Sequence, residues 1–316
     1  MPTYVRMLCL QAGGAPQPHR VHVHVQAVLL QRQRFARWLS ANASKYWLVY
    51  YDEQPWGVSA ARSRGRAPKG RAAVKEAPQG ESGYPNTATL VGAVSPQFGA
   101  VAAEYYLTET VTAQHTIHML GKVKKAMDAI TAERRRVPGA EVREYIVVMD
   151  NARIHTAKVV REYLQQSGLK VQFTARYSPM FNAIESVFSN TAISVRCNWR
   201  HKPTAVLDGD GKWQSAPASW TLGRAVKQAF VNAATPDKVR QYELGMFKFM
   251  PAAEALMVLE CTGDPPSEEQ LQEWVRTTTA AKVDAEIRSR IASQSQSSGE
   301  PPESVVASLG LGDAAV

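Results

Sequence analysis

Residues 144–155 read EYIVVMDNARIH, an apolar run that stops at Asp150. A run of this kind, bounded by polar residues, is typical of a short strand buried on both faces, and a side chain at its end is held rigidly. A second apolar run, Tyr46–Tyr51, stops at Asp52. The sequence therefore predicts two buried strands, each of which places a carboxylate at its end.

A third acid follows on a predicted helix. Residues 177–185 read YSPMFNAIE, and from Ile184 to Val195 apolar residues recur with helical spacing. This spacing puts Glu185 in the first turn of that helix. Two strand ends and a helix can thus bring three carboxylates to one place.

Three such carboxylates suit metal-dependent phosphoryl transfer. Phosphodiester cleavage needs an activated nucleophile, an in-line approach and a neutralised leaving oxygen, and two Mg²⁺ ions about 3.5–4 Å apart supply all three. These hard cations prefer the oxygen ligands that Asp and Glu provide. The arrangement points to an enzyme that cuts nucleic acid.

Each acid also has an ordinary structural interpretation. Asp150 or Asn151 could cap the next helix, and Asp52 could be a turn residue after its strand. Glu185 could complete an N-terminal cap begun by Asn182. Taken singly, each of these is the favoured interpretation. We favour the metal site because its rivals require three coincidences within one basic protein.

The rest of the chain predicts a mixed sheet with helices packed on it. His19, His22 and His24 alternate with valines, which favours a short strand with outward polar residues over a three-histidine metal site. Antiparallel strands followed by strand–helix alternation give the fold class, α/β with a helical C-terminal extension. The expected strands are 56–61, 88–95, 100–107 and 170–174, and the expected helices are 28–39, 112–132, 156–167, 222–233, 236–250 and one opened by a capping box at 267–270.

Composition limits the partners and the compartment. The formal net charge is +9, and because residues 264–316 carry −5, the first 263 residues carry +14, which suits a polyanionic partner. Cys9, Cys197 and Cys261 have no metal-ligand or disulfide spacing. No apolar run approaches the roughly 20 residues of a membrane span, and no secretion signal is recognisable, so we expect a soluble intracellular protein.

Several cations are candidates for phosphate contacts. Residues 62–75 hold six basic residues among glycines and a proline, which predicts a basic loop or hairpin. His155 is interpreted as a structural or phosphate-orienting residue rather than a general base, and Trp56 as a core aromatic rather than a base-stacking one. The candidate DNA-binding residues are Arg62, Arg64, Arg66, Lys69, Arg71, Arg153 and Arg176.

These motifs together resemble the catalytic core of mariner-type DDE transposases, over roughly residues 30–250. The resemblance implies an RNase H-like fold, two Mg²⁺ ions with Mn²⁺ as a substitute, and a catalytic and metal-binding triad of Asp52, Asp150 and Glu185. The shared motifs are Asp52-Glu53, Leu90–Val94, Asp150-Asn151-Ala152 with His155, Tyr177-Ser178-Pro179, Asn182 and Ile184-Glu185.

The same resemblance carries expectations about activity and partners. It implies DNA cleavage at transposon ends, attack of the freed 3′-hydroxyl on target DNA, and a homodimer in a synaptic complex, with no membrane partner. The alternatives are an RNase H-like nuclease or resolvase acting on another nucleic acid, and a domesticated, non-catalytic DNA-binding derivative. The expected location is the nucleus in a eukaryote, and otherwise the cytoplasm or nucleoid.

The chain departs from the family pattern at its front and in a few loop positions. Family members usually have prolines before Tyr-Ser-Pro and before Ile-Glu, where this chain has Ala175-Arg176 and Ala183. They also begin with a helix-turn-helix module that reads the transposon ends. We expect four parts here: 1–44 without a clear DNA-reading module, 45–250 as the RNase H-like catalytic domain, 251–292 as a helical extension, and 293–316 as a disordered tail.

Overall fold

The structure is a computed structural model of the chain. It describes residues 18–57, 87–107, 110–198, 205–207, 213–215, 218–257 and 264–277. The chain divides into two compact units, which are described separately. The sheet unit comprises Tyr46–Val171 and Ala183–Glu243, and the helical unit comprises the described residues of Met1–Lys45, Gln172–Asn182 and Leu244–Val316.

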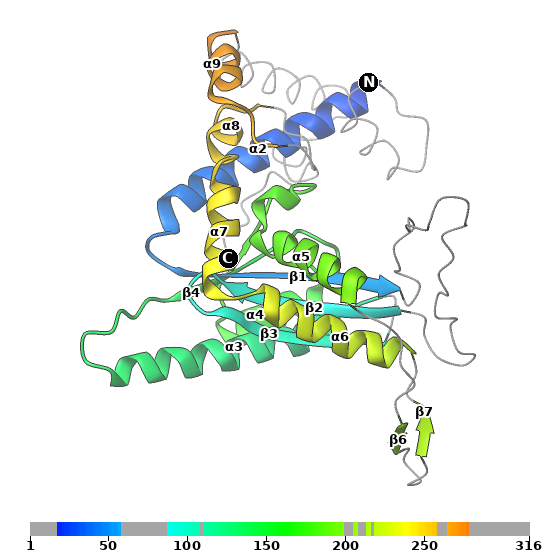
Figure 1. Cartoon of the computed structure of the whole chain (residues 1–316). Coiled ribbons are helices and arrows are strands. Elements are labelled where there is room, and N and C mark those ends of the chain that lie inside the picture. Colours follow the sequence, from blue (N-terminus) through cyan, green and yellow to red (C-terminus); the bar gives the residue numbers. More distant parts are fainter. Residues whose placement is uncertain are drawn as a thin grey trace, which may run out of the picture. The chain divides into compact units, whose positions relative to one another are not determined.

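A five-stranded mixed sheet forms the centre of the sheet unit (Figure 1). Its order is β3-β2-β1-β4-β5, with β2 antiparallel to both neighbours and β1 parallel to β4. The two apolar runs that end at acids form the adjacent central strands β1 and β4, as their burial on both faces predicts. The strands are β1 Trp47–Gly57, β2 Thr87–Ser95, β3 Gly99–Tyr106, β4 Tyr145–Met149 and β5 Val171–Phe173.

Helices cover both faces of this sheet (Figure 1). Helices α3 (Ala113–Arg136) and α4 (Lys158–Ser167) pack together on one face, and α5 (Ala183–Asn198) and α6 (Ala218–Ala233) pack on β1 to β3 from the other. Gly92 permits the close approach of the second pair, because a Cβ there would lie 2.6 Å from a ring carbon of Phe230. The predicted α/β class is confirmed.

The helical unit contains a buried arginine that ties a loop to a helix. In helix α2 (Pro18–Asn42), Arg32 is fully buried and donates Nε to Ser178 Oγ and a guanidinium NH₂ to the Tyr177 carbonyl, each at 2.8 Å. Tyr177 has a φ of 51°, a left-handed conformation that a non-glycine residue rarely adopts. The remaining elements of the described chain are the short helix Pro179–Phe181, β6 Ala205–Leu207 paired with β7 Trp213–Ser215, α7 Pro236–Phe247, α8 Met250–Glu254 and α9 Glu268–Thr277.

Three local predictions are wrong. The His/Val alternation at 19–25 lies within α2 rather than on a strand, because no breaker follows Pro18 and the segment continues the helix. Asp52 does not end its strand: β1 stays paired with β2 as far as Gly57, so the separate strand expected at 56–61 does not exist over its described residues. The helix expected over 236–250 stops at Phe247, and a new short helix begins at Met250 with a proline in its first turn.

Other expectations have mixed outcomes. The capping box is confirmed at α9, where the Gln270 amide donates to Ser267 Oγ and the Ser267 amide to Gln270 Oε1. In the described part of the chain no helix is long and apolar enough to cross a membrane. The basic segment 62–75 and the tail 293–316 lie outside the described residues.

Candidate active site

Asp52 and Asp150 lie side by side on neighbouring parallel strands. In the β1–β4 ladder Tyr50 is paired with Val148, and each acid follows its member of that pair by two residues. Because neighbouring strands are about 4.8 Å apart, the two carboxylates project from the same level of the sheet. Asp52 is inside the long strand β1, whereas Asp150 is the first residue after β4.

Glu185 completes the cluster from α5. Asp52 is paired with Gly92, and a Cβ at Gly92 would face Ile184 of α5 and Phe230 of α6. Since directly paired residues share a face of the sheet, the side chain of Asp52 points to the face on which α5 places Glu185 in its first turn.

The pKa shifts of Asp52 and Glu185 agree with the close approach of the three acids. Burial, and then the negative charges of Glu53, Asp150 and Glu185, hold the pKa of Asp52 well above its usual range. Burial, followed by the charge of Asp150, also raises the pKa of Glu185. The structure thus brings together all three carboxylates that the sequence singled out.

A histidine lies behind this cluster. His155 has no exposed side-chain surface, and its Nδ1 lies 2.6 Å from Asp150 Oδ1 while its Nε2 lies 3.0 Å from Glu53 Oε2. Its ring meets that of Tyr51 edge to face, with centroids 5.5 Å apart. The structural role that the sequence suggested for His155 therefore has a specific form, a bridge between two acids.

Both ring nitrogens of His155 face carboxylates, so the ring is an imidazolium. Burial alone would lower the pKa of His155, but the hydrogen bonds and charges of Asp150 and Glu53 outweigh it and raise that pKa to about 10. Sequence reasoning missed Glu53 as a member of the site. The available signal was its position next to Asp52, which places it on the opposite face of the strand.

The acid cluster has the donor chemistry of a site for hard divalent cations. Its oxygens come from carboxylates, and the charges that raise the pKa of Asp52 are all negative, so a bound cation would relieve a repulsion already present. Over the described residues, no three His, Cys, Asp or Glu side chains are arranged as they stand to enclose a metal ion. The donor set fits Mg²⁺, and closing it around an ion requires side-chain adjustment.

This repulsion gives a first prediction, for Asp52→Asn without added metal. Because the folded-state pKa of Asp52 is raised, the stability linked to this group is complete below its unfolded-state pKa and is lost as pH rises through the folded-state pKa, so at pH 7 this carboxyl group destabilises the fold. We expect the variant to melt higher than wild type, by about 2–4 °C for each kcal/mol of repulsion removed. Adding Mg²⁺ should raise the melting temperature of wild type more than that of the variant, as thermal melts with and without Mg²⁺ can measure.

Glu104→Gln is the matched control for this melt. Burial would raise the pKa of Glu104, but Lys122 and Lys227 lower it, so this carboxylate stabilises the fold at neutral pH. Its removal should lower the melting temperature, with or without Mg²⁺. An Asp52→Asn variant that melts below wild type in the absence of metal would contradict the mutual repulsion of the acids.

The other predicted site residues are two exposed arginines, a buried tryptophan and five cations outside the described chain. Arg153 and Arg176 are both exposed, and they belong to different units. Trp56 is buried, which agrees with a core aromatic. The five remaining candidate cations, Arg62, Arg64, Arg66, Lys69 and Arg71, are in the part of the chain that the structure does not describe.

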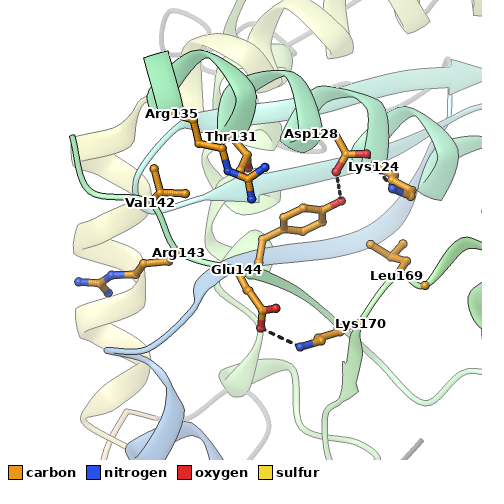
Figure 2. A pocket seen from close by; sticks show the side chains of 11 residues that line it. Lys124, Asp128, Thr131, Arg135, Val142, Arg143, Glu144, Leu169 and Lys170 are labelled. Carbon is orange, nitrogen blue, oxygen red and sulfur yellow. Dashed lines mark hydrogen bonds and ion pairs between the residues drawn. The ribbon is translucent and has the colours of Figure 1, made fainter. Parts of the chain in front are cut away.

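A cavity of about 450 Å³ lies at the other end of β4, beside α3 (Figure 2). Its lining includes Lys124, Asp128, Glu144 and Lys170, and each of these two acids forms an ion pair with one of the lysines. Lys124 pairs with Asp128 and Lys170 with Glu144, each at 2.7 Å. The cavity lies at the start of β4, whereas Asp150 follows the last residue of that strand, so the cavity is separate from the acid cluster.

Comparison with known proteins identifies the segment that contains the cluster. Residues 47–203 match the family described as DDE superfamily endonuclease. This range begins with β1 and includes Asp52, Asp150 and Glu185. No curated protein matches the chain in sequence.

Solved structures of the Mos1 mariner transposase share the fold. The pre-cleavage Mos1 transpososome aligns with a TM-score of 0.55 at 15% identity, over 80% of this chain and 70% of that one. The Mos1 strand transfer complex gives 0.54 at 15%, over 82% and 71%. The Mos1 paired-end complex with the left transposon end gives 0.53 at 16%, over 77% of this chain and 63% of that one.

These matches establish the fold class. The five-stranded mixed sheet with helices on both faces is RNase H-like, as expected. The chain spans only 63% of the length of the Mos1 chain in the paired-end complex.

Proposed function

Because residues 47–203 belong to the DDE superfamily endonucleases, we propose that this protein is a transposase catalytic domain that cleaves DNA and transfers the freed 3′-hydroxyl to target DNA. The observation that carries the proposal is the placement of Asp52, Asp150 and Glu185. They come from two adjacent parallel strands and a helix, and burial together with the negative charges of neighbouring acids raises the pKa values of Asp52 and Glu185.

The three acids are proposed to hold two divalent cations, Mg²⁺ or Mn²⁺. Such ions, when bound, activate the attacking oxygen and offset the charge of the leaving oxygen. Asp52 is fixed by its pairing with Gly92 of β2, and Asp150 by its hydrogen bonds to His155 and to the Ala152 amide. Glu185 approaches from α5 and can adjust its side chain to complete the ligand set.

DNA is the proposed partner, as both the transposon ends and the target. The first 263 residues carry +14, which suits a polyanion. The similar Mos1 structures are a paired-end complex with a transposon end and a strand transfer complex. By analogy we propose a homodimer that holds two ends in a synaptic complex, located in the nucleus in a eukaryotic host and otherwise in the cytoplasm or nucleoid.

A divalent-cation titration with intact and nicked duplexes tests this function. A transposase cuts only with Mg²⁺ or Mn²⁺ and joins the resulting 3′-hydroxyl to a second duplex. A nuclease or resolvase of the same fold would cut another nucleic acid, or cut DNA without joining. A non-catalytic derivative would bind DNA and leave it intact at every cation concentration, which would refute the proposal.

A second prediction concerns the basic segment 62–75. We propose that its cations contact DNA phosphates, which give affinity without sequence preference. Replacing Arg64, Arg66, Lys69 and Arg71 together with Gln should lower the slope of log K against log salt by about 0.9 for each phosphate that the variant no longer neutralises. Binding measured over a series of salt concentrations provides this slope. If it does not change, these cations do not contact DNA.

A further inference from the structure

The strand that carries Asp52 places Glu53 on the opposite face of the sheet, because successive side chains along a strand alternate. Asp52 faces α5, through its pairing with Gly92. Tyr51 faces α3, where its hydroxyl lies next to Thr116. Glu53 therefore shares the α3 face with Tyr51, and it approaches the acid cluster from behind rather than from the side of Glu185.

His155 connects this rear acid to Asp150. Its Nε2 lies 3.0 Å from Glu53 Oε2 and its Nδ1 lies 2.6 Å from Asp150 Oδ1. The histidine is also fixed through its backbone, since its amide donates to the Ala152 carbonyl at 3.1 Å. The side chain of Glu53 is only 17% exposed, so the bridge is largely shielded from water.

Asp150 is consequently held by one oxygen. Within the described chain, both hydrogen bonds to its carboxylate, from His155 and from the Ala152 amide, reach Oδ1. No described residue bonds Oδ2, and the side chain is 47% exposed. Fixing Oδ1 sets the torsion of the carboxylate and leaves Oδ2 as the oxygen available to a cation.

We propose that Glu53 and His155 form a positioning pair that orients Asp150 for cation binding, with Glu53 acting only through His155. This proposal rests on the proposed function of the acid cluster. Hydrogen-bond partners of metal ligands raise metal affinity because the ligand no longer loses rotational freedom when the ion binds. Glu53 would thus be a fourth essential acid without being a metal ligand.

Direct Mn²⁺ binding tests the pair without any need for DNA cleavage. Free Mn²⁺ is measured by electron paramagnetic resonance in titrations of the purified full chain. We expect Glu53→Ala to bind Mn²⁺ about 10–100-fold more weakly than wild type. Glu53→Gln should lie closer to wild type, since its amide oxygen still accepts from Nε2. Glu104→Gln, which removes a carboxylate from the same sheet away from His155, should bind as wild type does.

A double-mutant cycle separates positioning from direct ligation. If Glu53 acts through His155, then Glu53→Ala combined with His155→Gln binds Mn²⁺ no more weakly than His155→Gln alone. If Glu53 is itself a ligand, the two losses multiply and the proposal is overturned. Circular dichroism restricts the comparison to variants that remain folded, and Glu53→Gln serves where Glu53→Ala does not fold.

Failure of the positioning pair and failure of the proposed function give different experimental results. If wild type binds Mn²⁺ and cuts DNA while Glu53→Ala keeps full Mn²⁺ affinity, the positioning pair is refuted and the transposase site stands. If wild type binds Mn²⁺ but does not cut DNA, the function fails, and the Mn²⁺ affinities of the variants still decide the role of Glu53.

Discussion

Asp52→Asn, Asp150→Asn and Glu185→Gln are each expected to reduce metal-dependent DNA cleavage by about 10³-fold or more. Each change replaces a charged oxygen by a neutral amide in the proposed cation site, where bound cations would supply several kcal/mol of transition-state stabilisation. The loss should appear in the rate of the cleavage step at saturating DNA. Single-turnover assays with a labelled duplex, at a fixed Mg²⁺ concentration, measure this rate.

The three losses should not add. Because we propose that the acids share one pair of cations, we expect a variant that lacks two of them to be hardly slower than a variant that lacks one. Glu104→Gln, a carboxylate paired with Lys122 and Lys227 on the edge strand β3, is the control and should cleave at the wild-type rate. A single triad variant with near wild-type cleavage at equal Mg²⁺ would show that its residue is not a ligand.

Much of the fold could be predicted from the sequence because its central strands are short and uniformly apolar. Tyr145–Met149 is buried like a strand covered on both faces, and its uninterrupted apolar sequence predicts this burial. The positions of helix α5 and its first-turn acid follow from apolar spacing alone. The errors arose where local pattern and tertiary pairing disagree: β1 runs past a proline to Gly57 because β2 continues to pair with it. Sequence periodicity does not contain that information.

The sequence could predict the site residues that their own strand or helix places, but not the contacts between distant segments. Asp52, Asp150 and Glu185 were found because each occupies a definite place on a strand or helix. The bridge from Glu53 to His155 spans 102 positions in the sequence, and only the sheet brings the two together. To infer that Asp52 and Glu53 face opposite sides of the sheet, one must know that both lie inside a strand. Because the sequence suggested that the strand ends at Asp52, it gave no reason to place Glu53 on the opposite face.

The other large effect is expected for His155→Gln, on stability. The side chain of His155 is fully shielded from solvent, and its imidazolium neutralises two carboxylates. Removing it leaves Glu53 and Asp150 without that positive charge. We expect the metal-free variant to lose about 2–4 kcal/mol of unfolding free energy at pH 6, somewhat less than a broken pair of two fully buried charges costs, because Asp150 is half exposed.

The pH dependence of this loss distinguishes a charge effect from lost packing. The folded-state pKa of His155 is raised from 6.5 to about 10, so the folded protein binds that proton more tightly than the unfolded chain. The stabilisation is therefore complete below pH 6.5 and is lost as pH rises toward about 10, by at most about 1.4 kcal/mol for each pH unit. Urea unfolding of wild type and His155→Gln at pH 6 to 9 should show a narrowing difference. A difference that stays constant over this interval would mean that His155 stabilises the sheet by packing against Tyr51 and not by its charge.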